Sequence, residues 1–211
     1  MLMIGYYDYS MWATYIGLLS SVCGIWFTLS GSPLYAVFCL MFSGFCDMFD
    51  GKIARTKKDR TETEKRYGIQ LDSLSDLVCF GVLPVCIGYV SGCRRPIFVP
   101  FLVLYVLNAM IRLAYFNVTE EERQKETSDV RHTYLGIPVT SAALIFPFVY
   151  CFRTLCGDHF RFLYIVMITL TAIGFVSPIK IRKPGIRGMI LMTVIGLLLF
   201  AGLLYITLRV G

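Results

Sequence analysis

The sequence predicts an all-α polytopic membrane protein. Hydrophobic residues make up 56% of its 211 residues, and the mean hydropathy is +0.67. Charged residues make up only 16%, against about 25% in ordinary soluble proteins. A soluble chain of this length cannot bury so large an apolar fraction, and a disordered chain would be poor in hydrophobic residues. Both of these classes are therefore excluded.

Long uncharged runs indicate where the helices lie. The first run, Tyr9 to Cys46, is about twice the ~20 residues needed to cross a bilayer, and the sequence Gly31-Ser32-Pro33 divides it into two spans. We see none of the apolar and polar alternation of barrel strands. We therefore expect about seven membrane-spanning helices. The remaining uncharged runs are, in order, Leu77–Cys93, Pro96–Ile111, Thr133–Phe152, Phe162–Ile179 and Gly188–Leu208.

The two ends of the chain and its cysteines fit one transmembrane domain. Residues 1–12 lack the basic start of a cleavable signal peptide and are rich in aromatic residues, so we expect a retained segment at the membrane interface. Residues 180–211 contain a basic loop and the last span. The eight cysteines form no CxxC pair and fall mostly within spans, which favours small buried hydrophobic side chains over a disulfide or metal role.

Basic residues predict the orientation in the membrane. They gather in the loops after the second, fourth and sixth spans, which include every lysine, and the positive-inside rule makes these loops cytoplasmic. The net charge of +6 then lies mainly on a rim that faces anionic headgroups, which is a better explanation than nucleic-acid binding. The three loops contain Lys52, Arg55, Lys57, Lys58, Arg60, Lys65 and Arg66; Arg123, Lys125 and Arg131; and Lys180, Arg182, Lys183 and Arg187. The opposite loops contain Arg94, Arg95, Arg153 and Arg161.

Four aspartates form two stripes on consecutive spans. Asp47 and Asp50 are three residues apart near the end of the second span, and Asp72 and Asp76 are four apart at the start of the third. Two antiparallel helices would bring the four carboxylates together at the membrane edge, where their mutual repulsion requires cations. Oxygen ligands favour Mg²⁺, Mn²⁺ or Ca²⁺, and a two-metal site suits phosphoryl transfer. Small or basic residues lie on the same stripes, namely Gly51, Ala54, Arg55 and Gly68.

Three other interpretations of these acids are open. They could cap helices and pair with Lys52, Arg55 and Lys57 in a solvated rim, although four carboxylates at a membrane edge are costly without a function. They could belong to a divalent-cation transporter, although transporters usually place such ligands near the midplane and contain repeats. A structural membrane scaffold would leave the four aspartates unexplained.

The spacing of these residues resembles a known signature. The pattern D-x-x-D-G-x-x-A-R from Asp47 to Arg55, followed by G-x-x-x-D-x-x-x-D from Gly68 to Asp76, is similar to that of the CDP-alcohol phosphotransferase family. The resemblance implies that residues 1–211 form a single transmembrane catalytic domain, with a six-helix core and about one additional C-terminal span. It also implies CMP release and a homodimer. The implied metal ligands for two divalent cations are Asp47, Asp50, Asp72 and Asp76, with Asp76 as the catalytic base, and the implied nucleotide-binding residues are Asp50, Gly51, Ala54, Arg55 and Gly68.

Within the family, three segments resemble the integral-membrane phosphatidylserine synthases. They are Leu71–Pro84, Arg112–Val118 and Leu135–Pro138. This resemblance implies CDP-diacylglycerol and L-serine as substrates, phosphatidylserine as the product, Arg112 and Asn117 as acceptor-binding residues, and a bacterial plasma membrane with the active site at its cytoplasmic face.

Two departures from the pattern leave alternatives open. The spacer between Arg55 and Gly68 is longer than is usual in the family, and Tyr115 replaces a second arginine of the motif R-L-A-R-F-N. Glycerol 3-phosphate or inositol phosphate is the alternative acceptor. For Arg112, the alternative is a side chain that extends to the interface or pairs with one of the acids.

Overall fold

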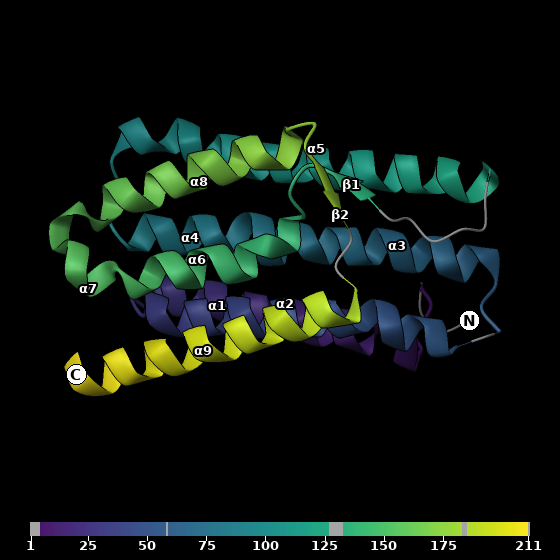
Figure 1. Cartoon of the computed structure of the whole chain (residues 1–211), viewed down its shortest axis with the longest axis horizontal. Helices are drawn as coiled ribbons and strands as arrows, with labels where there is room; N and C mark the ends of the chain where they lie inside the picture. Colours follow the sequence, from purple (N-terminus) through teal and green to yellow (C-terminus); the bar gives the residue numbers. More distant parts are fainter. Residues whose placement is uncertain (1–4, 58, 127–132, 183–184, 211) are drawn as a thin grey trace.

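The chain folds as a bundle of long helices that run along one axis (Figure 1). The structure is a computed structural model and describes residues 5–57, 59–126, 133–182 and 185–210. Helix α1 begins at one end of the bundle and α9 ends at the other. The α-helices are α1 (Trp12–Leu29), α2 (Pro33–Thr56), α3 (Glu62–Asp76), α4 (Leu83–Val90), α5 (Val99–Glu126), α6 (Ala142–Cys151), α7 (Arg153–Cys156), α8 (Phe160–Val176) and α9 (Ile186–Val210).

Short elements connect these helices. A two-stranded antiparallel sheet joins the loop before α6 to the loop after α8, with Thr133 opposite Arg182. Gly136 follows the first strand with φ +75°, and a side chain there would meet the carbonyl oxygen of Phe175. The short elements are the 3₁₀ turns η1 (Tyr9–Met11), η3 (Pro96–Phe98), η4 (Val139–Ser141) and η5 (Gly157–His159), the π-helical segment η2 (Leu77–Val82), and the strands β1 (Thr133–Leu135) and β2 (Lys180–Arg182).

The helices confirm an all-α polytopic membrane protein. Six helical segments are long and apolar enough to cross a bilayer, and the last of them is the C-terminal helix. The expected span Thr133–Phe152 is wrong in its extent, because its first residues form β1 and its apolar helix is the shorter segment Val139–Cys151. The six segments are Tyr9–Leu29, Pro33–Gly51, Glu62–Val90, Pro96–Arg123, Arg153–Val176 and Ile186–Leu208.

Small residues allow α1 and α2 to pack closely as an antiparallel hairpin. Gly31 (φ +78°) makes the turn, and Pro33 starts α2 at a position where its missing N–H is not needed. The hydroxyls of Ser21 and Ser43 lie 2.8 Å apart between the helices, and Ser43 also donates to the carbonyl of Gly17. Close backbone approach and buried hydroxyl pairs are how helices associate where water is absent.

The third long rod is α3, η2 and α4 in succession. Pro84 has no N–H to donate to Phe80 four residues earlier, and the hydroxyl of Tyr105 on α5 donates to that carbonyl instead, at 2.7 Å. The wider π-helical turn lies directly after Asp76. Tyr105 therefore fixes the rod just beyond the residues that carry the acidic motif.

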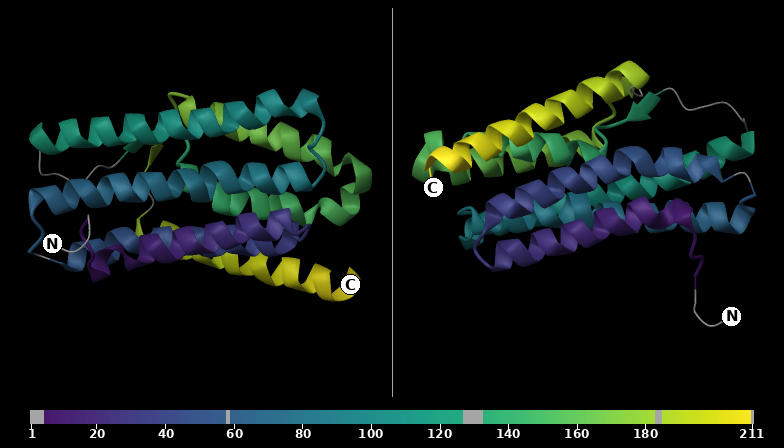
Figure 2. Two further views of the ribbon diagram at one scale, coloured as in Figure 1. Left: turned by 180° about the vertical axis from the view of Figure 1, so that it is seen from behind. Right: turned by 90° about the horizontal axis from the view of Figure 1, so that it is seen from below.

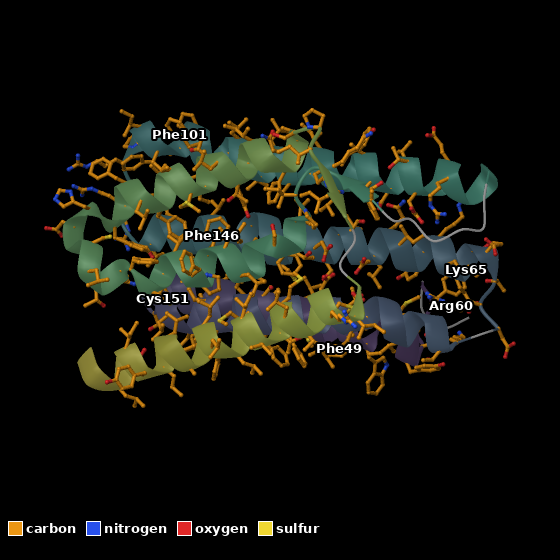
Figure 3. All side chains as sticks on the ribbon, in the orientation of Figure 1. Phe49, Arg60, Lys65, Phe101, Phe146 and Cys151 are labelled. Atoms are coloured by element: carbon orange, nitrogen blue, oxygen red, sulfur yellow. The ribbon has the colours of Figure 1, made fainter. Side chains whose placement is uncertain are left out.

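The core lies between α2, η2, α5, α6 and α8. Its largest fully buried side chains include Tyr105, Phe146 and Tyr164, and the ring of Phe146, labelled in Figure 3, packs against both tyrosines. All eight cysteines are free thiols, and Cys23 is exposed on α1 rather than buried as expected.

The last helix, α9, lies on the outside of the bundle along α2 and α6 (Figure 2). Only 6% of its most apolar stretch is buried. The C-terminal ends of α2 and α5 lie at one end of the bundle, and the turns after α1, α4 and α6 lie at the other (Figure 1).

Candidate active site

Three aspartates from two neighbouring helices converge within the bundle. Asp47 and Asp50 come from α2, and Asp72 comes from α3. One carboxylate oxygen from each lies within 4.8 Å of the others, and all three residues are half-buried. The spacing of three residues on α2 turns both side chains toward α3, so the stripes expected from the sequence do meet.

Asp76 is the last residue of α3 and lies one turn beyond Asp72 in the same pocket. Its carboxyl group is within hydrogen-bonding reach of Asp47, as that of Asp72 is of Asp50. The pocket is lined by Ala13, Thr14, Gly17, Ser43, Asp47, Asp50, Asp72, Ser75, Asp76, Cys79 and Phe80.

The donor set of this pocket fits divalent cations. Oδ1 of Asp72 is buried and has no hydrogen-bond partner among the described residues. None of the four carboxylates pairs with a lysine or arginine whose side chain the structure describes, and Lys57 instead pairs with Asp8 and Glu64. Clustered carboxylates that are not paired with lysine or arginine side chains need metal ions for charge balance, and sites with only oxygen ligands suit hard ions such as Mg²⁺.

Helix α1 forms a third wall of the site that the sequence analysis did not identify. Ala13, Thr14 and Gly17 line the pocket, and Ser75 on α3 donates to the carbonyl of Thr14 at 3.4 Å. The stripe of small residues on α1 was the available signal, because such residues mark close helix contacts.

Of the expected nucleotide-binding residues, Asp50 lines this pocket, whereas Gly51 and Gly68 do not. Gly51 follows Asp50 on α2 and is exposed. Ala54 and Arg55 lie in the last turn of α2, and their side chains lie outside the described part of the structure. The space over Gly68 contains the guanidinium of Arg60, whose Nη2 is 2.6 Å from the position that a Cβ would take.

The two expected acceptor-binding residues are on α5 and lie at different depths. Arg112 is buried, with its guanidinium carbon 5.2 Å from the ring centroid of Phe116. Oδ1 of Asn117 accepts a 3.0 Å hydrogen bond from Ser73, the neighbour of Asp72. Tyr115, at the position of the second motif arginine, is 50% exposed. Arg131 and His132 lie outside the described residues.

The comparisons with known proteins agree with the motif. The sequence matches the model of the CDP-alcohol phosphatidyltransferase family over residues 10–176. It is similar to proteins named CDP-diacylglycerol--serine O-phosphatidyltransferase from three organisms. The one from Saccharomyces cerevisiae is 36% identical over 153 residues, which are 67% of this chain and 54% of the yeast protein. The one from Helicobacter pylori strain 26695 is 32% identical over 133 residues, which cover 62% of this chain and 50% of that protein. The one from Mycobacterium tuberculosis strain H37Rv is 26% identical over 132 residues, which cover 62% and 44%. The chain thus spans about half the length of the curated relatives it matches.

Proposed function

Because the chain belongs to the CDP-alcohol phosphatidyltransferase family, we propose that it transfers the phosphatidyl group of CDP-diacylglycerol to the hydroxyl of L-serine, giving phosphatidylserine and CMP. The observation that carries this proposal is the pocket in which the carboxylates of Asp47, Asp50 and Asp72 converge beside Asp76. The names of the relatives support serine as the acceptor.

In this proposal the four aspartates would hold two divalent cations, Mg²⁺ or Mn²⁺, with Ca²⁺ as a further candidate. Such ions, when bound, neutralise phosphate charge and polarise the reacting oxygens. Asp76, at the deep end of the pocket beside Asp47, takes the proton of the serine hydroxyl. The hydroxyl oxygen bonds to the phosphorus that carries diacylglycerol, the bond from that phosphorus to the bridging oxygen breaks, and CMP leaves.

The motif residues around Asp50 would bind the nucleotide. They are Asp50, Gly51, Ala54, Arg55 and Gly68. The exposed backbone at Gly51 supports this assignment, because a residue without a side chain lets a ligand approach the helix.

Arg112 and Asn117 would bind the acceptor. Asn117 is held against α3 by Ser73, next to Asp72, which supports a position near the reacting groups. The buried guanidinium of Arg112 suits the carboxylate of serine, because charge-assisted hydrogen bonds are strong in a desolvated site. Glycerol 3-phosphate or inositol phosphate would bring an additional phosphate and would require more basic groups in the cavity than the two that we expect there, Arg112 and Arg55.

The placement in the cell is part of the same proposal. We infer that residues 1–211 act as one catalytic domain, with residues 1–12 at the membrane interface and residues 180–211 as a loop and an additional span. The lysine-rich sequence between the two helices that carry the aspartates supports a cytoplasmic active site. The bacterial relatives support a bacterial plasma membrane, and we expect a homodimer, as the resemblance implies.

The test is CMP release by the purified protein in detergent, with CDP-diacylglycerol and Mg²⁺ or Mn²⁺. L-serine is compared with glycerol 3-phosphate, inositol, inositol phosphate and no acceptor. We expect release with serine and loss of release in Asp76→Asn, which keeps the shape of the side chain and should still bind the CDP-lipid. Release with a different acceptor alone would overturn the serine assignment but leave the reaction class. No release with any acceptor or metal would favour a cation transporter.

A further inference from the structure

Arg60 is a half-buried arginine outside the acidic motif. It lies in the loop between α2 and α3, at the end of the bundle where Figure 3 labels it beside Lys65. Its Nε is buried and has no hydrogen-bond partner among the described residues, and its Nη2 makes a long 3.5 Å contact with the carbonyl oxygen of Glu64. Within the part of the chain that the structure describes, no carboxylate forms an ion pair with Arg60. This guanidinium therefore has donors left for an anion.

The loop that carries Arg60 is held at both sides. Before it, Nζ of Lys57 pairs with Asp8 at 2.8 Å and with Glu64 at 3.5 Å. After it, Thr61 caps α3 in a reciprocal capping box with Glu64. The position of Arg60 is consequently fixed by its neighbours, although the spacer between Arg55 and Gly68 is longer than is usual in the family.

The guanidinium lies one helical turn from an acid of the pocket. It covers Gly68, which precedes Asp72 by four residues, or about 6 Å along the axis of α3. Two divalent cations would balance the four aspartates, and the two negative charges of a nucleotide-linked diphosphate would still lack a partner. Arginine suits that role because its planar group presents several donors to phosphate oxygens.

Resting on the proposed function, we propose that Arg60 binds the diphosphate of the CDP-linked substrate. In this interpretation Gly68 has a second role beyond the one implied by the motif: it leaves the space in which the guanidinium of Arg60 lies. A methyl group at Gly68 would displace the end of a flexible side chain rather than backbone, so Gly68→Ala should fold normally while moving Arg60.

The test measures binding of CDP to the full chain in detergent with Mg²⁺ by calorimetry, together with KM for CDP-diacylglycerol and for L-serine. Arg60→Ala should weaken CDP binding about tenfold and raise KM for CDP-diacylglycerol by a similar factor, with KM for serine unchanged. Arg60→Lys should fall between, because one point charge replaces the forked donors. The matched control is Arg66→Ala, since Arg66 is 69% exposed and pairs with Glu121; it should bind CDP like the wild type.

A double-mutant comparison tests the contact itself. Gly68→Ala should weaken CDP binding more in the wild type than in an Arg60→Ala background, because part of its effect in the wild type comes from moving Arg60. Equal losses in the two backgrounds, or wild-type CDP affinity in a folded Arg60→Ala protein, would overturn the inference about Arg60 alone. If Arg60→Ala does not fold, Arg60→Lys and Gly68→Ala still decide it. If the wild type binds CDP more tightly than Arg60→Ala but releases no CMP, the proposed reaction would be overturned instead.

Discussion

Removing one charge from the acidic pocket should stabilise the protein without metal and abolish its stabilisation by metal. Asp50→Asn keeps the shape of the side chain and removes its repulsion with the two neighbouring carboxylates. One pair of unit charges 4.8 Å apart, the upper limit of the separations in this cluster, repels by about 3 kcal/mol at an effective dielectric constant near 20. In EDTA, at a pH at which these carboxylates are ionised, the variant should therefore be more stable by about 3 kcal/mol for the repulsion of one neighbour, or roughly 6–12 °C in Tm for a chain of this length.

Metal should close most of the stability difference between the two proteins. At a free Mg²⁺ or Mn²⁺ concentration of about 100 times Kd, the wild type should gain about 2.7 kcal/mol. Asp50→Asn, which lacks one ligand, should gain little. Unfolding can be followed with a thiol-reactive dye, because Cys79 and Cys93 are buried in the folded protein.

The control is Asp158→Asn, which changes an exposed acid in η5, outside the acidic cluster. It should leave both Tm values and the metal response at wild-type levels. The reasoning about the cluster would be refuted if Asp50→Asn were less stable than the wild type in EDTA, or if metal stabilised the two proteins equally.

Three further outcomes are expected. The carboxylate of Asp8 accepts hydrogen bonds from Nζ of Lys57 and from the backbone N–H of Ser10, which lower its pKa from 3.8 to about 2. The pair with Lys57 therefore stabilises the fold above about pH 4, and this contribution is lost as pH falls toward 2. Thermal melts of Asp8→Asn should lack that acid-dependent step. Gly44→Ala should cost about 1–3 kcal/mol of unfolding free energy, measured as a lower Tm, because the new methyl group would overlap Cβ of Ala143 on α6. Asn117→Ala should raise KM for serine about tenfold, because the amide that Ser73 holds near Asp72 is removed, whereas KM for CDP-diacylglycerol should stay constant. A higher KM for CDP-diacylglycerol with an unchanged KM for serine would contradict the acceptor assignment.

The longer spacer between Arg55 and Gly68 illustrates where local sequence signals were sufficient. Thr61 and Glu64 form a capping box that could be found from the sequence, and α3 begins beside them at Glu62. About half of the spacer is therefore helix, and the loop itself is short. The family match over residues 10–176 likewise agrees with a motif that could be recognised from the sequence alone.

The membrane class, the order of the helices and the two acidic stripes followed from the sequence by itself. They depend on hydropathy and on the 3.6-residue helical period, which are local properties.

Three features were decided only by the tertiary structure: the pairing of Lys57 with Asp8, the wall that α1 adds to the pocket, and the position of Arg60 over Gly68. The first two depend on how segments distant in sequence pack against one another, and the third depends on the path of the loop before α3. The shortened α6 has the same kind of cause, because β1 pairs with a strand that lies 45 or more residues further along the chain. Local periodicity contains no information about such partners.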